Sequence, residues 1–218
     1  MASRRGSVTA SEVNGGAPDT TRRSLLAAAR AAFAESGLRG ARVDDIAQRA
    51  GVNKQLVYHY FGSKDGLYTA VLEQVYREIR DQEAELALDT LPPEAAMRRL
   101  VEFSFDYLLR SPDFVRLLAD ENAQNGRHLQ GSAVVETVNR PIIALIQKTL
   151  RRGVSEGSFR ADLDPLQLYL SIAGMSFFFF ANIHTLSRAF DRELGTPAGV
   201  AQRRAHIVDF TLKAIRAD

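Results

Sequence analysis

Two short segments with apolar patterning, residues 43–50 and 54–60, lie on either side of Gly51 and constrain the fold more than any other feature. Gly51 tolerates the positive φ of a tight turn, and Asn53 can cap the second segment. Two short helices joined by a glycine turn form a helix-turn-helix, in which Ala47 is small enough for the second helix to cross the first. The apolar positions that would hold the pair on a preceding helix are Ile46, Ala50, Val52, Val57 and Phe61.

The same spacing leaves one face of the second segment directed outward. The residues on this face are Lys54, Gln55, Leu56, Tyr58 and His59. Glutamine can pair with adenine edges and lysine with guanine O6 and N7, so the face suits the major groove of DNA. Tyr58 and Tyr60 are two residues apart and cannot share a helix face. We therefore expect Tyr60 to be partly packed, with its hydroxyl group directed outward.

The rest of the chain is predicted to be helical, which makes the fold class all-α. A first helix begins near Thr20 and ends near Gly37, and Ser63 caps a long helix. The apolar stripe of this long helix is Leu67, Val71, Leu72, Val75 and Ile79. Further helices are expected over residues 93–110, 112–124, 131–153, 164–190 and 197–216. Pro141 is a candidate for a kink in the third of these helices.

Composition excludes several kinds of protein. There is no cysteine, so thiolate nucleophiles, disulfides and zinc–sulfur sites are excluded. Residues 1–64 hold 10 Lys/Arg and 5 Asp/Glu, and the other 154 residues hold 18 and 21, which gives net charges of +5 and −3. A basic front part suggests a polyanionic partner. The longest apolar run, "IAGMSFFFFANI", is shorter than the roughly 20 residues of a membrane span, so we expect a cytoplasmic protein without membrane contact.

Residues 20–75 resemble the DNA-binding domain of the tetracycline-repressor (TetR) family of transcriptional regulators. The pieces that carry the resemblance are "AAFAESG", "VDDIAQRAGV" and "VYHYFGSKDGLY". The resemblance implies that Lys54, Gln55, Leu56, Tyr58 and His59 read bases. It also implies that Tyr60 and Lys64 contact phosphates. Family members often have threonine where Arg42 stands; Arg42 can meet a phosphate as a charge but cannot cap the helix.

The resemblance also implies a division of the chain. We expect a flexible basic arm over residues 1–19, a three-helix helix-turn-helix DNA-binding domain over 20–66, and a larger helical ligand-binding and dimerisation domain over 67–218. The implied function is that of a dimeric repressor, which leaves a near-palindromic operator when a small molecule binds the rear domain. A regulator of the same fold that answers to a protein partner, or to nothing, is the alternative. An enclosed cavity in the rear domain would discriminate between them.

Four consecutive phenylalanines, 177–180, turn through about 300° of a helix and cannot all face one neighbour. The helix that carries them must therefore be covered on more than one side. The dimer-interface candidates are Ala173, Gly174, Phe178 and Ala181. The ligand-pocket candidates are Phe103, Tyr107, Phe114, Asn122, His128, Phe177 and His184, which would suit an aromatic or amphipathic effector.

An all-α enzyme that uses histidine, tyrosine and lysine chemistry is the reading that the sequence favours least. No acid–base pair or cofactor loop is evident. His59 has no histidine or carboxylate three or four residues away, so it is not expected to bind a metal. We therefore expect a protein that is not an enzyme and has no metal or cofactor.

Overall fold

The computed structural model describes residues 16–217, which are almost entirely helical and contain no β-strand. Most of the predicted arm, residues 1–15, lies outside the described part. Residues 16–19, which were also assigned to the arm, form the first turn of a helix. The chain separates into two compact units between Val71 and Leu72. The sequence predicts this boundary between residues 66 and 67, and both points fall within one helix, α4.

The first unit is the helix-turn-helix with its supporting helices. Its elements are α1 (Gly16–Gly40), α2 (Val43–Arg49), α3 (Gln55–Phe61) and the first part of α4 (Lys64–Ala84). Gly37 has φ 66° and interrupts the regular part of α1, as the sequence predicts. Gly51 has φ 68° in the turn between α2 and α3, a conformation that favours glycine.

The core of the first unit uses the apolar positions that the pattern indicates. Ile46, Val57 and Leu67 are fully buried. The rings of Phe33 and Tyr68 meet edge to face with their centres 5.0 Å apart, which fixes α4 against α1.

Side-chain caps fix the ends of these helices. The Asn53 side-chain oxygen accepts a hydrogen bond from the Gln55 amide at 2.9 Å. The Ser63 hydroxyl accepts one from the Gly66 amide at 2.9 Å. Arg42, at the start of α2, makes no side-chain cap bond. Helix α3 is therefore positioned by short local interactions as well as by its buried face.

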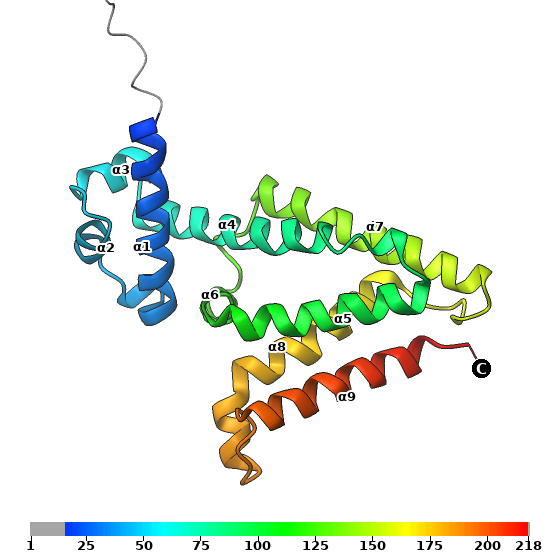
Figure 1. Ribbon diagram of the computed structural model, residues 1–218. Coiled ribbons are helices and arrows are strands. Elements are labelled where there is room, and N and C mark those ends of the chain that lie inside the picture. The colour runs from blue at the N-terminus through cyan, green and yellow to red at the C-terminus, as the bar shows by residue number, and fades with distance from the viewer. Residues whose placement is uncertain (1–15, 218) are drawn as a thin grey trace, which may run out of the picture. The chain divides into compact units, whose positions relative to one another are not determined.

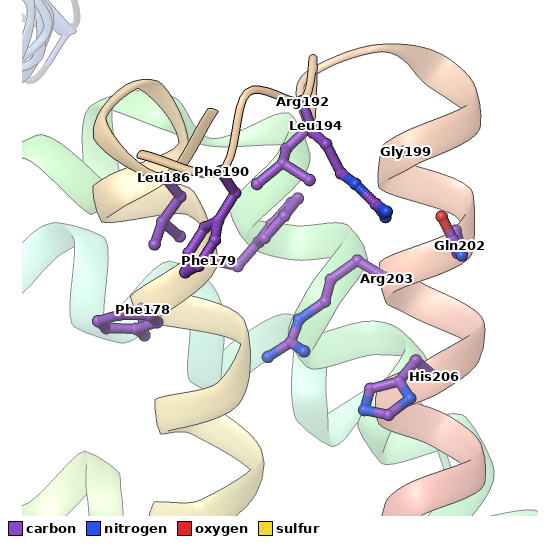
Figure 2. Close-up of a pocket in the computed structure, with 10 residues that line it drawn as sticks. All are labelled: Phe178, Phe179, Leu186, Phe190, Arg192, Leu194, Gly199, Gln202, Arg203 and His206. Carbon is purple, nitrogen blue, oxygen red and sulfur yellow. The ribbon is translucent and has the colours of Figure 1, made fainter. Parts of the chain in front are cut away.

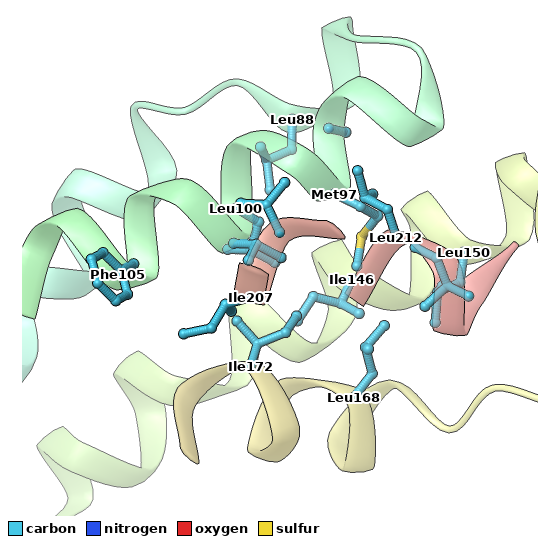
Figure 3. Packing of buried hydrophobic residues seen from close by; sticks show 14 of the residues in the cluster. Leu88, Met97, Leu100, Phe105, Ile146, Leu150, Leu168, Ile172, Ile207 and Leu212 are labelled. Atoms are coloured by element: carbon cyan, nitrogen blue, oxygen red, sulfur yellow. The ribbon is translucent and has the colours of Figure 1, made fainter. Parts of the chain in front are cut away.

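The second unit is a bundle of long helices. Its elements after α4 are η1 (Leu88–Thr90), α5 (Pro93–Arg110), α6 (Pro112–Ala123), α7 (Ala133–Ser155), α8 (Pro165–Ala189) and α9 (Pro197–Ile215). Within this unit α5 packs against α7, α8 and α9 (Figure 1). Met97, Leu100, Ile146 and Ile172 lie in the shared core (Figure 3). Pro141 lies inside α7, which is an unbroken run of helical residues.

The four phenylalanines of α8 divide between core and surface. Phe179 is buried, and its ring lies 6.0 Å from that of Phe105. Phe180 is half-buried against the same Phe105 ring at 4.8 Å. Phe178 is 57 % exposed. In the single chain α8 packs against α5, α6, α7 and α9, and the face that carries Phe178 stays accessible.

One expectation about α8 needs correction. By length and composition alone, its 25 residues are apolar enough to cross a membrane. This is weak evidence, since core helices of globular proteins pass the same test. Leu168, Ile172 and Phe179 of α8 belong to the core of the second unit, while Leu166, Leu170 and Phe178 are about half exposed in the single chain.

Candidate DNA-binding surface and ligand cavity

Helix α3 presents a polar surface because only Val57 within it is buried. Lys54, Gln55, Tyr58 and His59 are exposed, while Leu56 is half-buried. Tyr58 has half of its surface accessible. The predicted base-reading residues therefore share one accessible face, with Leu56 at its margin.

The surroundings of this face leave its side chains able to move. Lys54 Nζ lies 3.0 Å from an Asp44 carboxylate oxygen, and both side chains are more than half exposed. An exposed ion pair of this kind contributes about 0–1 kcal/mol, so it does not hold Lys54 in place. The His59 and Tyr60 rings meet edge to face with centres 5.1 Å apart.

The three predicted phosphate-contacting residues lie at or beside helix ends in the first unit. Arg42 is exposed at the start of α2. Tyr60 is half-buried, as expected, in the last turn of α3. Lys64, the first residue of α4, is half-buried, and its Nζ lies 3.5 Å from the Arg39 carbonyl oxygen. Helix starts attract phosphate because their amide groups are unpaired.

The second unit contains a cavity of about 410 Å³, within the range of small-molecule sites. Its walls come from α4, α5, α6, α7 and α8 and are mostly apolar, with several aromatic rings. Its lining residues include Tyr76, Arg80, Glu83, Phe114, Tyr169 and Phe177.

A polar cluster stands in the wall of this cavity. Arg80 Nη1 is bonded to the Glu83 carboxylate, and its Nη2 donates a hydrogen bond to the Tyr169 hydroxyl oxygen at 2.6 Å. The Arg80 and Glu83 side chains are only 9 % and 4 % exposed. The Nε atom of Arg80 is buried and finds no acceptor among the described residues. The cavity is therefore apolar with a charged end.

Burial decides the protonation of this cluster. Desolvation raises the pKa of Glu83 to about 7 and outweighs the attraction of Arg80. Burial also disfavours the charge of Arg80, but Glu83 and Tyr169 more than offset this, so the pKa of Arg80 is raised. Burial raises the pKa of Tyr169 and of Tyr76 as well. Arg80 therefore stays charged at neutral pH, whereas Glu83 changes between its protonated and its ionised form near this pH.

The predicted pocket residues fall into three groups. Phe114 and Phe177 line the cavity. Tyr107 is buried behind Phe114, with the ring centres 5.4 Å apart, and Phe103 is buried against Tyr107 at 5.8 Å. The other three lie elsewhere, since none of them lines this cavity: Asn122, His128 and His184.

These three residues have other surroundings. Asn122 is exposed, and its amide donates to the Leu118 carbonyl oxygen at 2.8 Å. His184 is exposed and lines a separate depression at the end of α8. His128 Nδ1 lies 2.7 Å from a Glu121 carboxylate oxygen, and both side chains are nearly inaccessible. The His128 pair fixes the loop after α6.

Sequence reasoning missed the charged end of the cavity. Arg80 and Glu83 continue the buried stripe of α4 beyond Ile79 at helical spacing. A charged pair three residues apart on an apolar stripe was thus a readable signal. Tyr169 carried no such signal, because its contact with Arg80 spans 89 positions of the chain.

The predicted dimer-interface residues lie along α8, where an apolar face is accessible. Phe178, Leu170 and Leu166 are about half exposed, and Phe210 of α9 is similar. Gly174 and Ala181 are exposed, and Ala173 is half-buried in the cavity wall. A second hollow of about 350 Å³ adjoins this face at the turn between α8 and α9; its walls include Phe178, Phe190, Arg203 and His206 (Figure 2). Among the described residues no group of three or more histidine or carboxylate side chains could hold a metal ion.

Comparisons with known proteins agree with this geometry. Residues 25–71 match the model of "Bacterial regulatory proteins, tetR family", and residues 93–211 match "Tetracyclin repressor-like, C-terminal domain". The HTH-type transcriptional repressor NicS of Pseudomonas putida is 35 % identical over 198 residues, covering 91 % of this chain and 93 % of the relative. The repressor KstR2 of Rhodococcus jostii is 31 % identical over 146 residues, covering 66 % and 70 %.

Solved structures show the same fold. The transcriptional regulator SCO4942 of Streptomyces coelicolor superimposes with a TM-score of 0.65 at 28 % identity and covers 89 % of this chain and 98 % of its own. The ketosteroid transcriptional regulator KstR2 of Mycobacterium tuberculosis gives a TM-score of 0.64 at 25 % identity, with coverage of 90 % and 95 %.

An exposed recognition helix in a helix-turn-helix, followed by a separate helical unit, defines a DNA-binding transcription regulator. The matched models together cover most of the chain, and the relatives named above are transcriptional regulators. The chain belongs to the TetR family.

Proposed function

We propose that this chain is a ligand-responsive repressor that binds a near-palindromic operator as a homodimer and leaves it when a small molecule enters the cavity of the second unit. The cavity of about 410 Å³ carries the ligand half of this proposal. Its volume and aromatic walls support a small-molecule response, although it opens to the surface at Leu170 and Gly174 and is not enclosed. The relatives named as repressors support repression.

The apolar face of α8 and α9 supports the proposed dimer. Phe178, Leu170 and Phe210 expose large apolar side chains on two adjacent helices, and apolar patches of this kind mark interaction sites. A two-fold dimer also gives two recognition helices, which can read two half-sites in successive major-groove turns. A regulator of this kind acts on DNA in the cytoplasm, without a catalytic role.

The base-reading role belongs to Lys54, Gln55, Leu56, Tyr58 and His59, and the phosphate role to Arg42, Tyr60 and Lys64. The test is a titration of the full chain against the DNA flanking its own coding region, at two salt concentrations. Selective binding at two chains per site is expected. Tyr58→Ala and His59→Ala are each expected to weaken operator binding by about 1–3 kcal/mol while leaving non-specific binding near its original level.

A control variant separates the recognition face from the rest of the surface. Thr185→Ala changes an exposed residue of α8 and is expected to bind the operator like the wild type. If both Tyr58→Ala and His59→Ala leave the operator affinity unchanged, the base-reading role of this face is contradicted. Binding of a single chain per operator site would contradict the proposed dimer.

A further inference from the structure

The charged end of the cavity keeps one buried hydrogen-bond donor without an acceptor. Arg80 uses Nη1 for Glu83 and Nη2 for Tyr169, while its Nε–H is buried without an acceptor. A guanidinium group has five N–H donors and no acceptor capacity. An unsatisfied buried donor costs free energy, so a ligand atom that accepts from it gains that amount on binding.

The charges around the cavity select the sign of the ligand. Arg80 and Glu83 are the charged residues among those described that line it. The buried Glu121 of α6, whose charge acts on Tyr76, lies outside the wall and is bonded to His128. A ligand cation would place two positive charges against one carboxylate, and Arg80 cannot lose its proton to relieve them. A ligand carboxylate would place two negative charges against one guanidinium, but Glu83 can become neutral by taking up a proton. The site therefore tolerates an anion far better than a cation.

The remaining walls select the body of the ligand. Tyr76, Phe114, Tyr169 and Phe177 present four aromatic rings to the cavity, and the Tyr76 and Phe114 rings meet edge to face at 6.1 Å. Flat rings pack on aromatic walls in stacked or edge-to-face arrangements. Leu108 and Leu118 add aliphatic surface.

We propose that the effector is a ring-bearing carboxylic acid, that its carboxylate binds Arg80, and that Glu83 takes up one proton from solvent as the anion enters. The charge balances: the cavity gains one anion and one proton. This inference rests on the proposed ligand response and specifies its chemistry.

Among the titratable side chains around Glu83, only Glu83 itself is able to take up the proton. Arg80 and Tyr76 from α4 and Tyr169 from α8 are the titratable side chains around it in this cavity, and α5 and α7 contribute the neutral Ser104 and Asn139. Arg80 and Glu83 also line another cavity, of about 360 Å³, which is distinct from the hollow between α8 and α9. Its one additional charged lining residue among those described is Asp81, which is exposed. Burial raises the pKa of both tyrosines, so they remain protonated at neutral pH. Burial raises the pKa of Glu83 to about 7, so its protonation there has little cost.

Calorimetric titration of the full chain with matched acids and amides tests the proposal. The probes are benzoate against benzamide and 2-naphthoate against 2-naphthamide, in buffers of low and high ionisation enthalpy at pH 6, 7 and 8. The wild type is expected to prefer each acid by about ten- to hundred-fold, the range of a hydrogen bond to a charged group. It should take up close to one proton per acid at pH 8 and a small fraction at pH 6.

Variants locate the effect. Glu83→Gln is a permanently neutral mimic and is expected to bind the acids without proton uptake and with a flat pH dependence. Arg80→Gln alone leaves a buried carboxylate unpaired, so the double variant Arg80→Gln with Glu83→Gln removes both charges and is expected to lose the preference for acids. Arg77→Gln, which changes an exposed arginine of the same helix, is the control and is expected to behave like the wild type.

Each other outcome overturns the inference. Amides that bind as well as acids, acid preference that survives in the double variant, or no binding of either acid would each reject a carboxylate on Arg80. Operator release is measured separately on the same samples. An acid that binds with proton uptake but leaves operator affinity unchanged would place a carboxylate on Arg80, but it would overturn the effector role of the acid together with the ligand response of the proposed function.

Discussion

Glu83 shows at the scale of one residue how burial turns a common side chain into a sensor of pH. Its side chain is 4 % exposed and lies against Arg80, yet desolvation outweighs this partner and raises its pKa to about 7 from an ordinary value of 4.5. The folded state therefore binds more protons than the unfolded state between these two pH values. Its stabilising contribution is present below about pH 4.5 and is lost as the pH rises through about 7.

Glu83→Gln is expected to remove this contribution to pH dependence. The free energy of unfolding of the wild type should fall relative to that of the variant by about 2–3 kcal/mol between pH 5 and pH 8, since one pKa unit is worth about 1.4 kcal/mol. Urea unfolding followed by circular dichroism at several pH values measures it. Glu85→Gln, which changes an exposed carboxylate just after α4, should keep the pH dependence of the wild type. Parallel curves for wild type and Glu83→Gln would contradict the assignment.

At the scale of elements, the sequence predicts best where the deciding interactions are local. The turn at Gly51 and the caps at Asn53 and Ser63 involve neighbours a few positions apart, and the structure confirms each of them. The stripe of α4 is confirmed as well, because its period alone decides which face is buried. Local signals thus sufficed for the helix-turn-helix and for the all-α class.

The cavity is a different matter, because residues far apart in the chain build it. Tyr169 meets Arg80 across 89 positions, and no spacing rule connects them. Aromatic content drew the prediction to Phe103 and Tyr107, which the structure places in the core instead. The imidazole of His128 suggests a pocket residue, but His128 is bonded to Glu121 and does not line the cavity. Residue type alone did not separate lining from packing.

The accessible face of α8 carries a prediction at the same scale. Phe178 is 57 % exposed in the single chain, so Phe178→Asp should cost the monomer little and yet place a charge in an apolar dimer interface. We expect monomers in analytical ultracentrifugation, at concentrations where the wild type is dimeric, with unchanged helix content. Leu109→Asp, at an α5 residue that is 47 % exposed, is the matched control and should remain dimeric. A dimer that survives Phe178→Asp would place the interface elsewhere.

At the scale of the whole molecule, the uneven charge of the chain sets how its affinity for DNA responds to salt. Residues 1–64 carry a net charge of +5, while the remainder carries −3, so the attraction to phosphate is concentrated in the part that holds α3. Each lysine that neutralises a phosphate releases counterions, and the slope of log affinity against log salt is about −0.9 per contact. A dimer presents every such contact twice, so its loss should lower the slope by about 2 per dimer.

Lys64→Ala should therefore weaken binding to every DNA sequence by a similar factor and flatten the salt dependence, unlike the changes on α3, which alter sequence preference. Fluorescence anisotropy with operator and scrambled duplexes at four salt concentrations measures both quantities. Lys148→Ala, at an exposed lysine of the second unit, is the control and should leave the slope unchanged. If Lys64→Ala keeps the full slope, Lys64 contacts no phosphate, and the bond from its Nζ to the Arg39 carbonyl oxygen is its whole role. If the loss falls on the operator alone, Lys64 belongs with the base-reading residues, because phosphate contacts carry no sequence information directly.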